Sequence, residues 1–170
     1  MDELLKRHTQ MPIEVIKGDT TIQPNHIYLV SSDKNIISQN GMIKQIDRKP
    51  SSTLNLPIDE FFYSMGNDWK ENAIGVILSG TGSDGSRGIR TIKEAGGLIF
   101  VQDPSTAQFN GMPNAAIAIG VADKVLPPYA IAHEIVGVVK KANSQLNQLL
   151  NLTNIYEKEL FDKILNQVEY

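Results

Sequence analysis

The sequence predicts an α/β fold that combines a parallel sheet with a β-hairpin. Two apolar runs, residues 73–79 and 97–102, are nearly continuous and are separated by a glycine-rich turn and an amphipathic segment. Such runs are typical of parallel strands that are covered on both faces. Residues 35–47 instead form two alternating runs that meet at Asn40-Gly41. This dipeptide favours a hairpin because both of its residues tolerate a positive φ.

The first third of the chain is predicted to be rich in strands. Residues 1–9 place leucines on one face of a short helix, which ends before Pro12. Residues 12–18 and 25–32 have the pattern of strands and are separated by a polar turn.

A polar loop over 47–55 leads into a predicted helix over 56–69. The apolar residues of that helix share one face: Ile58, Phe61, Phe62 and Met65. We interpret this aromatic stripe as part of the core.

The last third begins with a loop that contains short helical pieces, over 104–120, and a short edge strand over 123–128. An amphipathic helix is predicted over 129–142. Residues 143–154 are polar and rich in amides, which predicts a linker, and the apolar pattern of 155–170 predicts a further helix.

Composition restricts the function. Sixteen basic and nineteen acidic residues give a net charge of -3, and no basic cluster is long enough to follow a phosphate backbone, so nucleic acid is not expected as a partner. The absence of cysteine excludes disulfides and thiolate chemistry, and a metal site is not expected. The N-terminus lacks the pattern of a signal peptide and no run approaches a membrane span, so we expect a cytoplasmic protein.

The glycine turn admits a nucleotide-binding interpretation. Gly80, Gly82 and Gly85 satisfy G-x-G-x-x-G between a strand and a helix, and Asp103 lies about twenty residues further on, where it could bind a ribose. Against this interpretation, the Asp84 carboxylate would repel a pyrophosphate. The fingerprint also normally lies in the opening βα turn, whereas here strands precede it.

Two other roles are open to Asp84. It could satisfy the first amides of the helix that begins near Ser86, as a capping residue. Alternatively, an acid on a glycine turn at the carboxyl end of a strand could orient a catalytic histidine. Spacing alone does not complete such a triad, because neither the nearby serines nor the histidines occupy a recognisable motif: Ser79, Ser83, Ser86, His8, His26 and His133.

Three segments together resemble a known family. They are "GVILSGTGSDGSRGIRTIKEAGG", "VQDPSTAQFNGMPNAAIAIGVADKVLPP" and, upstream, "PNHIYLV". These segments are similar to the catalytic domain of the chemotaxis protein-glutamate methylesterases (CheB). The resemblance covers about residues 1–142, and the segment over 155–170 resembles the start of a CheR-type methyltransferase domain, as found in CheB–CheR hybrid proteins.

The resemblance implies an incomplete doubly wound, mainly parallel sheet with a β-hairpin insertion. It also implies a serine hydrolase that needs no cofactor, removes methyl esters from glutamates of chemoreceptor cytoplasmic helices, and can deamidate glutamines there. In this family an acid of the glycine turn holds the catalytic histidine, and Asp84 matches that acid.

The residues expected to shape the site surround Asp84. They are Gly80, Thr81, Gly82 and Gly85 of the turn, and Gly111, Met112 and Pro113 of the family's "GMP" loop. Thr81 stands where many members carry Met, and for Met112 simple packing is the alternative role.

The serine and the histidine of the family's triad match nothing in these residues. We therefore expect a fragment, a mis-called start or a degenerate remnant that is inactive alone and prone to associate, because missing strands leave a sheet edge exposed. A remnant that binds a receptor or signalling partner, and the nucleotide-binding module, are the alternatives.

Overall fold

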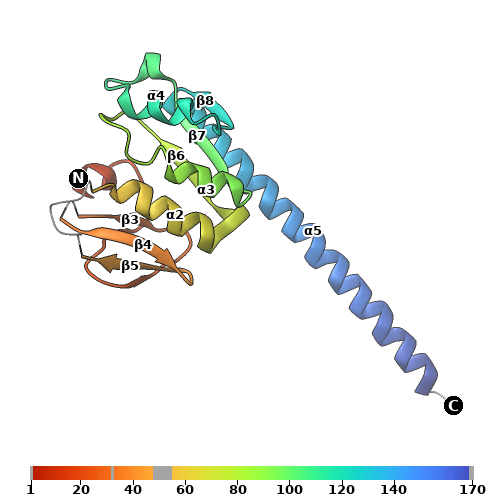
Figure 1. The fold of residues 1–170 in the computed structure, drawn as a ribbon. Coiled ribbons are helices and arrows are strands. Elements are labelled where there is room, and N and C mark those ends of the chain that lie inside the picture. The colour runs from red at the N-terminus through yellow and green to blue at the C-terminus, as the bar shows by residue number, and fades with distance from the viewer. Residues whose placement is uncertain (1, 32, 48–54, 169–170) are drawn as a thin grey trace. The chain divides into compact units, whose positions relative to one another are not determined.

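A computed structural model describes residues 2–31, 33–47 and 55–168, with the side chains of residue 2 and of 151–168 left out (Figure 1). Residues 48–54 of the predicted polar loop lie outside the described residues. The chain divides into two compact units, Met1–Pro128 and Tyr129–Tyr170, which are described separately below.

The first unit begins with a short helix and a small parallel sheet. Helix α1 (Asp2–Lys6) precedes strand β1 (Ile13–Val15), which pairs in parallel with β3 (Ile27–Leu29) so that Ile13 lies opposite Ile27. Both strands were predicted from their alternating pattern. β3 has a partner on one side only in the described sheet, because its order is β1-β3.

The predicted hairpin is confirmed. Strands β4 (Asn35–Gln39) and β5 (Met42–Ile46) pair antiparallel, and β2 (Thr20–Thr21) adds to the other edge of β5. Asn40 and Gly41 have φ values of 54° and 72°, the left-handed conformation that made this dipeptide a hairpin signal.

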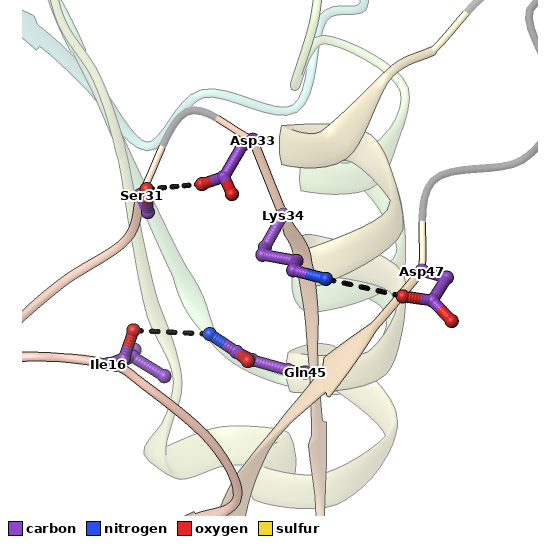
Figure 2. A network of polar contacts seen from close by, with 6 residues as sticks. All are labelled: Ile16, Ser31, Asp33, Lys34, Gln45 and Asp47. Atoms are coloured by element: carbon purple, nitrogen blue, oxygen red, sulfur yellow. Dashed lines mark hydrogen bonds and ion pairs between the residues drawn. The ribbon is translucent and has the colours of Figure 1, made fainter.

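One polar contact joins the hairpin to the segment after β1, and another joins the two outer ends of the hairpin (Figure 2). Gln45 Nε2 donates a hydrogen bond of 3.1 Å to the carbonyl oxygen of Ile16, which follows β1. Lys34 Nζ lies 3.3 Å from Asp47 Oδ1 in an exposed ion pair. Ile16 is buried in a small apolar cluster with Ile36 and Ile43 of the hairpin. The Gln45 hydrogen bond therefore joins β5 to the segment that contributes Ile16 to this cluster.

Helix α2 (Pro57–Trp69) lies between the hairpin sheet and helix α3 (Gly88–Glu94), in contact with both (Figure 1). It ends at the short 3-10 helix η1 (Lys70–Asn72). The stripe predicted as core does pack there: Phe62 is buried, and Ile58, Phe61 and Met65 pack against the same cluster. Phe61 also contacts the cluster beneath the hairpin, so α2 joins the two cores.

The second half of the unit is a three-stranded parallel sheet of order β6-β7-β8. Its strands are β6 (Ile74–Ile77), β7 (Leu98–Gln102) and β8 (Lys124–Leu126). The central strand is the most deeply buried, with Ile99 and Val101 both inaccessible. The connection from β7 to β8 contains the 3-10 helix η2 (Pro104–Thr106) and helix α4 (Gly111–Ala118). The α/β class with parallel strands and a hairpin is therefore confirmed.

The second unit is a single helix, α5 (Pro128–Val168). It includes the helix predicted over 129–142, but residues 143–154, interpreted as a polar linker, continue the same helix without a break. The physical reason is that Gln, Leu and Asn side chains are compatible with a solvated helix, so polarity alone did not define a loop. None of the described helices combines the length and apolarity needed to cross a membrane.

Helices α2 and α3 approach closely at two glycines. A Cβ on Gly66 would lie 2.8 Å from the backbone nitrogen of Ile92 and 2.9 Å from the carbonyl carbon of Thr91. A Cβ on Gly88 would lie 2.6 Å from Phe62 Cβ and 2.8 Å from the carbonyl oxygen of Asp59. Backbone atoms cannot move aside as a flexible side chain can, so these positions set the distance between the helices.

We therefore expect Gly66→Ala to lower the free energy of unfolding by roughly 1–3 kcal/mol, although alanine favours helix, because the two helices must separate. Gly137→Ala is the matched control, since Gly137 also lies in a helix and an added Cβ there meets nothing within 4 Å. The control should be neutral or stabilising by up to roughly 1 kcal/mol. Urea unfolding of both variants tests this, and equal effects would contradict the close approach.

The hairpin turn is held by Asp68 of α2. Its carboxylate accepts hydrogen bonds from the Ser38 hydroxyl (2.6 Å) and from the amides of Asn40 (2.8 Å) and Gly41 (3.1 Å). The Ser38 hydroxyl and these two amides lower the pKa of Asp68 despite an opposing contribution from burial. All three donors favour the ionised form, so the network is strongest when Asp68 is charged.

Because the pKa of Asp68 is lowered by folding, its contribution to stability is present above the unfolded-state pKa, about 3.9, and is lost as the pH falls through the folded-state value. Asp68→Asn should lose roughly 1–3 kcal/mol at neutral pH and should lose less further stability on acidification than the wild type. Asn67→Ala, in the same turn of α2, should keep the wild-type pH dependence. Denaturation curves between about pH 7 and pH 3 distinguish these outcomes.

Candidate functional site

The glycine turn follows β6 directly and lies at the carboxyl end of a parallel strand. Gly82 and Gly85 adopt φ values of 82° and 88°, a conformation that side chains rarely tolerate. A Cβ on Gly85 would also lie 2.7 Å from Ile58 Cγ2 and 2.9 Å from Ile77 Cδ1. The turn is therefore pressed against the start of α2, and glycine is required at Gly85 for both its conformation and its close contact.

The Asp84 carboxylate binds the N-terminus of α2. Its Oδ2 accepts from the amide of Ile58 (3.1 Å), and its Oδ1 accepts from the amide of Asp59 (2.9 Å). Asp84 is thus a capping residue, as one interpretation of the sequence predicted. That interpretation named the wrong helix, because Asp84 caps α2 and not α3, the helix that follows it in sequence. Capping also places the charge at the positive end of the α2 dipole. Asp84 is half-buried.

Asp59, in the first turn of α2, in turn caps the N-terminus of α3. Its Oδ1 accepts from the amides of Arg87 (2.9 Å) and Gly88 (2.7 Å), which are the first amides of α3. Asp59 is only 3% exposed, and its Oδ2 has no hydrogen-bond partner among the described residues. Each helix therefore carries in its first turn, or just before it, the acid that caps the other.

The "GMP" residues close over the other side of the turn. The sequence predicted a loop here, but these residues form the first turn of α4. The amide of Met112 donates to the carbonyl oxygen of Gly80 (3.0 Å), and the amide of Gly80 donates to that of Phe109 (2.9 Å). A Cβ on Gly80 would collide with Met112 Sδ, and one on Gly111 would lie 3.1 Å from the nitrogen of Gly82. Met112 packs against the core, and the Pro113 side chain is fully buried.

The exposed residues of the turn are Thr81 and its neighbours Gly82 and Ser83. Of the nearby serines, Ser79 is already engaged, because its hydroxyl accepts from the Phe109 amide (3.0 Å) and its own amide donates to Gln102 Oε1 (2.8 Å). Ser86 is buried. Ser79 and Ser86 are therefore held in structural positions, and Ser83 is exposed in the turn.

None of the three histidines, all of which lie in the described part of the chain, hydrogen-bonds to Asp84. His26 Nδ1 lies 2.9 Å from the carbonyl oxygen of Pro24, and its ring stacks on that of Tyr28. His8 follows α1, and His133 is an exposed residue of α5.

Asp103 has a local structural role. Its Oδ1 accepts from the Ser105 amide (2.9 Å) and hydroxyl (2.8 Å), so that it caps η2. These two hydrogen bonds, the amide first, lower the pKa of Asp103. The acid at the end of β7 is therefore held toward the chain that follows it.

An apolar cavity of about 290 Å³ lies beside the start of α2. It is lined by residues that follow β3, by the start of β4 and by the first turns of α2: Val30, Ser31, Lys34, Ile36, Pro57, Ile58 and Phe61. Ile58 joins this cavity to the glycine turn, because its amide is bound by Asp84. The cavity can accept an apolar side chain or another uncharged group.

The arrangement suits Asp84 to position another group. A carboxylate offers about four acceptor positions, and the two amides of α2 use two of them. Because these amides fix its oxygens and it is only half-buried, Asp84 can use a remaining acceptor position to bind an imidazole N–H and hold the ring in one tautomer and orientation. The fold and the site together define an α/β protein that holds a fixed acid at the carboxyl end of a parallel strand.

Comparison with known proteins names the family. A model of the CheB methylesterase family matches residues 1–135, and the chain therefore belongs to that family. The crystal structure of the Thermotoga maritima CheB methylesterase catalytic domain is similar, with a TM-score of 0.71 and 26% identity, covering 80% of this chain and 74% of that one. The expected family and fold are thus confirmed.

The chain is also similar in sequence to longer proteins. The protein-glutamate methylesterase/protein-glutamine glutaminase 2 of Burkholderia pseudomallei is 31% identical over 142 residues, covering 83% of this chain and 42% of its own length. An uncharacterised 104.1 kDa protein from the hypE 3′ region of Rhodobacter capsulatus is 40% identical over 126 residues, covering 74% of this chain and 13% of its own. The chain thus spans less than half the length of these relatives.

Asp59 is the site residue that sequence reasoning missed. Its position in the first turn of a helix that begins at Pro57 marks it as a favourable acid for its own helix dipole. Nothing in the spacing indicates that it binds amides of α3, because that contact joins segments almost thirty residues apart.

Asp59→Ala should lower the free energy of unfolding by roughly 1–3 kcal/mol, because two amides of α3 lose their acceptor in a buried place. Hydrogen exchange at the Arg87 and Gly88 amides should accelerate more than exchange in β7. Glu14→Ala, at an exposed acid of β1, is the control and should change stability by less than about 0.5 kcal/mol. Unchanged protection of the Gly88 amide would show that Asp59 does not cap α3.

Proposed function

We propose that this chain is the C-terminal portion of a protein-glutamate methylesterase catalytic domain, and that Asp84 orients its catalytic histidine. The observation that carries the proposal is the half-buried Asp84 carboxylate, which two amides of α2 hold at the carboxyl end of β6. The methylesterase names of the relatives and the family match support the reaction class.

In the proposed reaction, a serine hydroxyl attacks the γ-carbonyl of a glutamate methyl ester. The histidine takes the serine proton and delivers it to the departing methoxide, which leaves as methanol. Water then hydrolyses the acyl-enzyme by the same proton transfers and regenerates the serine. A glutamine amide would follow the same path and release ammonia, in keeping with the glutaminase name of the relatives.

The serine and histidine of this reaction come from residues other than the 170 present. Two features support a complementary segment. Strands β3 and β6 each have an unpaired edge in the described sheets. In addition, Val30 and Leu78, which follow these strands directly, are 46% and 48% exposed. Strands paired with these edges would bury apolar side chains and satisfy backbone groups that now face solvent.

The proposed substrates and partners follow from the reaction. They are the methylated cytoplasmic helices of chemoreceptors, which places the protein in the cytoplasm. A CheR-type methyltransferase domain in the same parent chain is the proposed continuation of the segment over 155–170. The much greater length of the Rhodobacter capsulatus relative, of which the matched region is 13%, supports a multidomain parent.

The test compares the 170-residue chain with a longer protein translated from the reading frame that includes the serine and histidine segments. Methanol release from methylated receptor should occur only with the longer protein. In that protein Asp84→Asn should reduce the rate by roughly three to four orders of magnitude, because the histidine loses its orientation. Asp103→Asn, at the end of the neighbouring strand β7, is the matched control and should leave the rate unchanged.

Three results would argue against the proposal. Equal effects of Asp84→Asn and Asp103→Asn would remove the special role of Asp84. A native protein of 170 residues that binds receptor without hydrolysis would favour a non-catalytic remnant. A rise in melting temperature with nicotinamide nucleotides would favour the nucleotide-binding interpretation of the glycine turn.

A further inference from the structure

Helix α5 carries an apolar seam with the spacing of a coiled coil. Counting from Tyr129 as the first a position, the a and d positions through Leu150 recur every three and four residues: Tyr129, Ala132, Val136, Val139, Asn143, Leu146 and Leu150. Six of the seven are apolar or aromatic, and the stretch covers about three heptads, near the minimum length for a coiled coil.

All seven seam residues are exposed, and the large apolar ones among them are between 48% and 72% exposed. A separate stripe of the same helix behaves differently, because Ile131 is 3% exposed and Ile135 and Val138 are half-buried. The helix therefore has two apolar stripes, and the seam is the more exposed of the two. A row of large exposed apolar side chains of this length marks an interaction surface.

The shape of the seam is that of a knobs-into-holes interface. A shallow hollow on α5 is lined by Tyr129, Ala132, His133 and Val136. These four residues are spaced at i, i+3, i+4 and i+7, which is the set that forms one hole for a side chain of a facing helix.

Asn143 decides which helix fits. It is the polar residue at an a position, in the middle of the seam, where an apolar partner would leave its amide without a hydrogen bond. A second copy of the same helix, parallel and in register, places the same amide directly opposite, and the two can hydrogen-bond to each other. A single asparagine at an a position is known to specify parallel two-stranded pairing and register in this way.

From these features we infer that residues 129–150 of α5 form a parallel, in-register, two-stranded coiled coil with a second copy of this chain. The seam would extend for about 33 Å at 1.5 Å per residue. The dimer joins two chains of the methylesterase family through their α5 helices. It rests on the helix alone and is independent of the proposed reaction, so that either can fail without the other.

The absence of cysteine allows a direct test in the whole chain. Leu146→Cys places one thiol at a d position, and mild oxidation should convert most of the protein to a disulfide-linked dimer, because parallel helices in register bring the two thiols within bonding range. Gln148→Cys lies on the opposite side of the helix and should remain largely unlinked under the same conditions. Equal linking of both variants, or none at position 146, would overturn the proposed register.

Sedimentation velocity over about 1–100 μM tests the association itself, and a dimer is expected for the unmodified chain. Leu146→Asp should weaken dimerisation by at least about tenfold, since it places a charge in the seam. Gln148→Asp makes the same change in charge on the opposite side and should leave the dimer intact. A monomer at every concentration, or a dimer that Leu146→Asp does not weaken, would refute the coiled coil, the latter by showing that another surface associates.

Discussion

The structure of the first unit depends on a reciprocal pair of caps between two helices. Asp84, just before α3, binds the first free amides of α2, while Asp59, in the first turn of α2, binds those of α3. Each carboxylate satisfies amides that a helix cannot satisfy internally and lies at the positive end of a helix dipole. Because the two interactions share the same pair of helices, neither helix can shift along the other without breaking both. The glycine turn, which lies between the two helix starts, is thereby held in place.

The same helix pair connects the two halves of the sheet system. Gly66 and Gly88 allow the backbones of α2 and α3 to come into contact. The side chains of α2 then pack against the parallel sheet and against the hairpin. Phe62 enters the core beneath β6 and β7, while Phe61 contacts both that core and the smaller one under the hairpin. At its far end, α2 holds the hairpin turn through Asp68. One amphipathic helix therefore links the glycine turn, a parallel sheet and a hairpin.

For the proposed chemistry, this construction supplies rigidity where a positioning residue needs it. An acid that orients an imidazole is useful only if its own oxygens are fixed, since a small displacement misaligns the proton transfers. The α2 amides fix the Asp84 oxygens from one side, and the start of α4 closes over Gly80 and Gly82 on the other. The coiled coil proposed for α5 is separate from this construction.

The sequence by itself determined the main elements. Apolar runs predicted β6 and β7, and Asn40-Gly41 predicted the hairpin, because these signals are local and depend on backbone conformation and on burial of a strand. The glycine spacing left several roles open to Asp84, and the family resemblance selected it as an orienting acid. Only the tertiary structure decided what Asp84 binds, that Asp59 answers it, and that the "GMP" residues begin a helix against the turn. Those contacts join segments some thirty residues apart, so their geometry depends on how α2, α3 and α4 pack. The sequence also left the state of residues 143–154 open, since polar side chains are equally compatible with a solvated helix and with a linker. In the structure these residues continue α5.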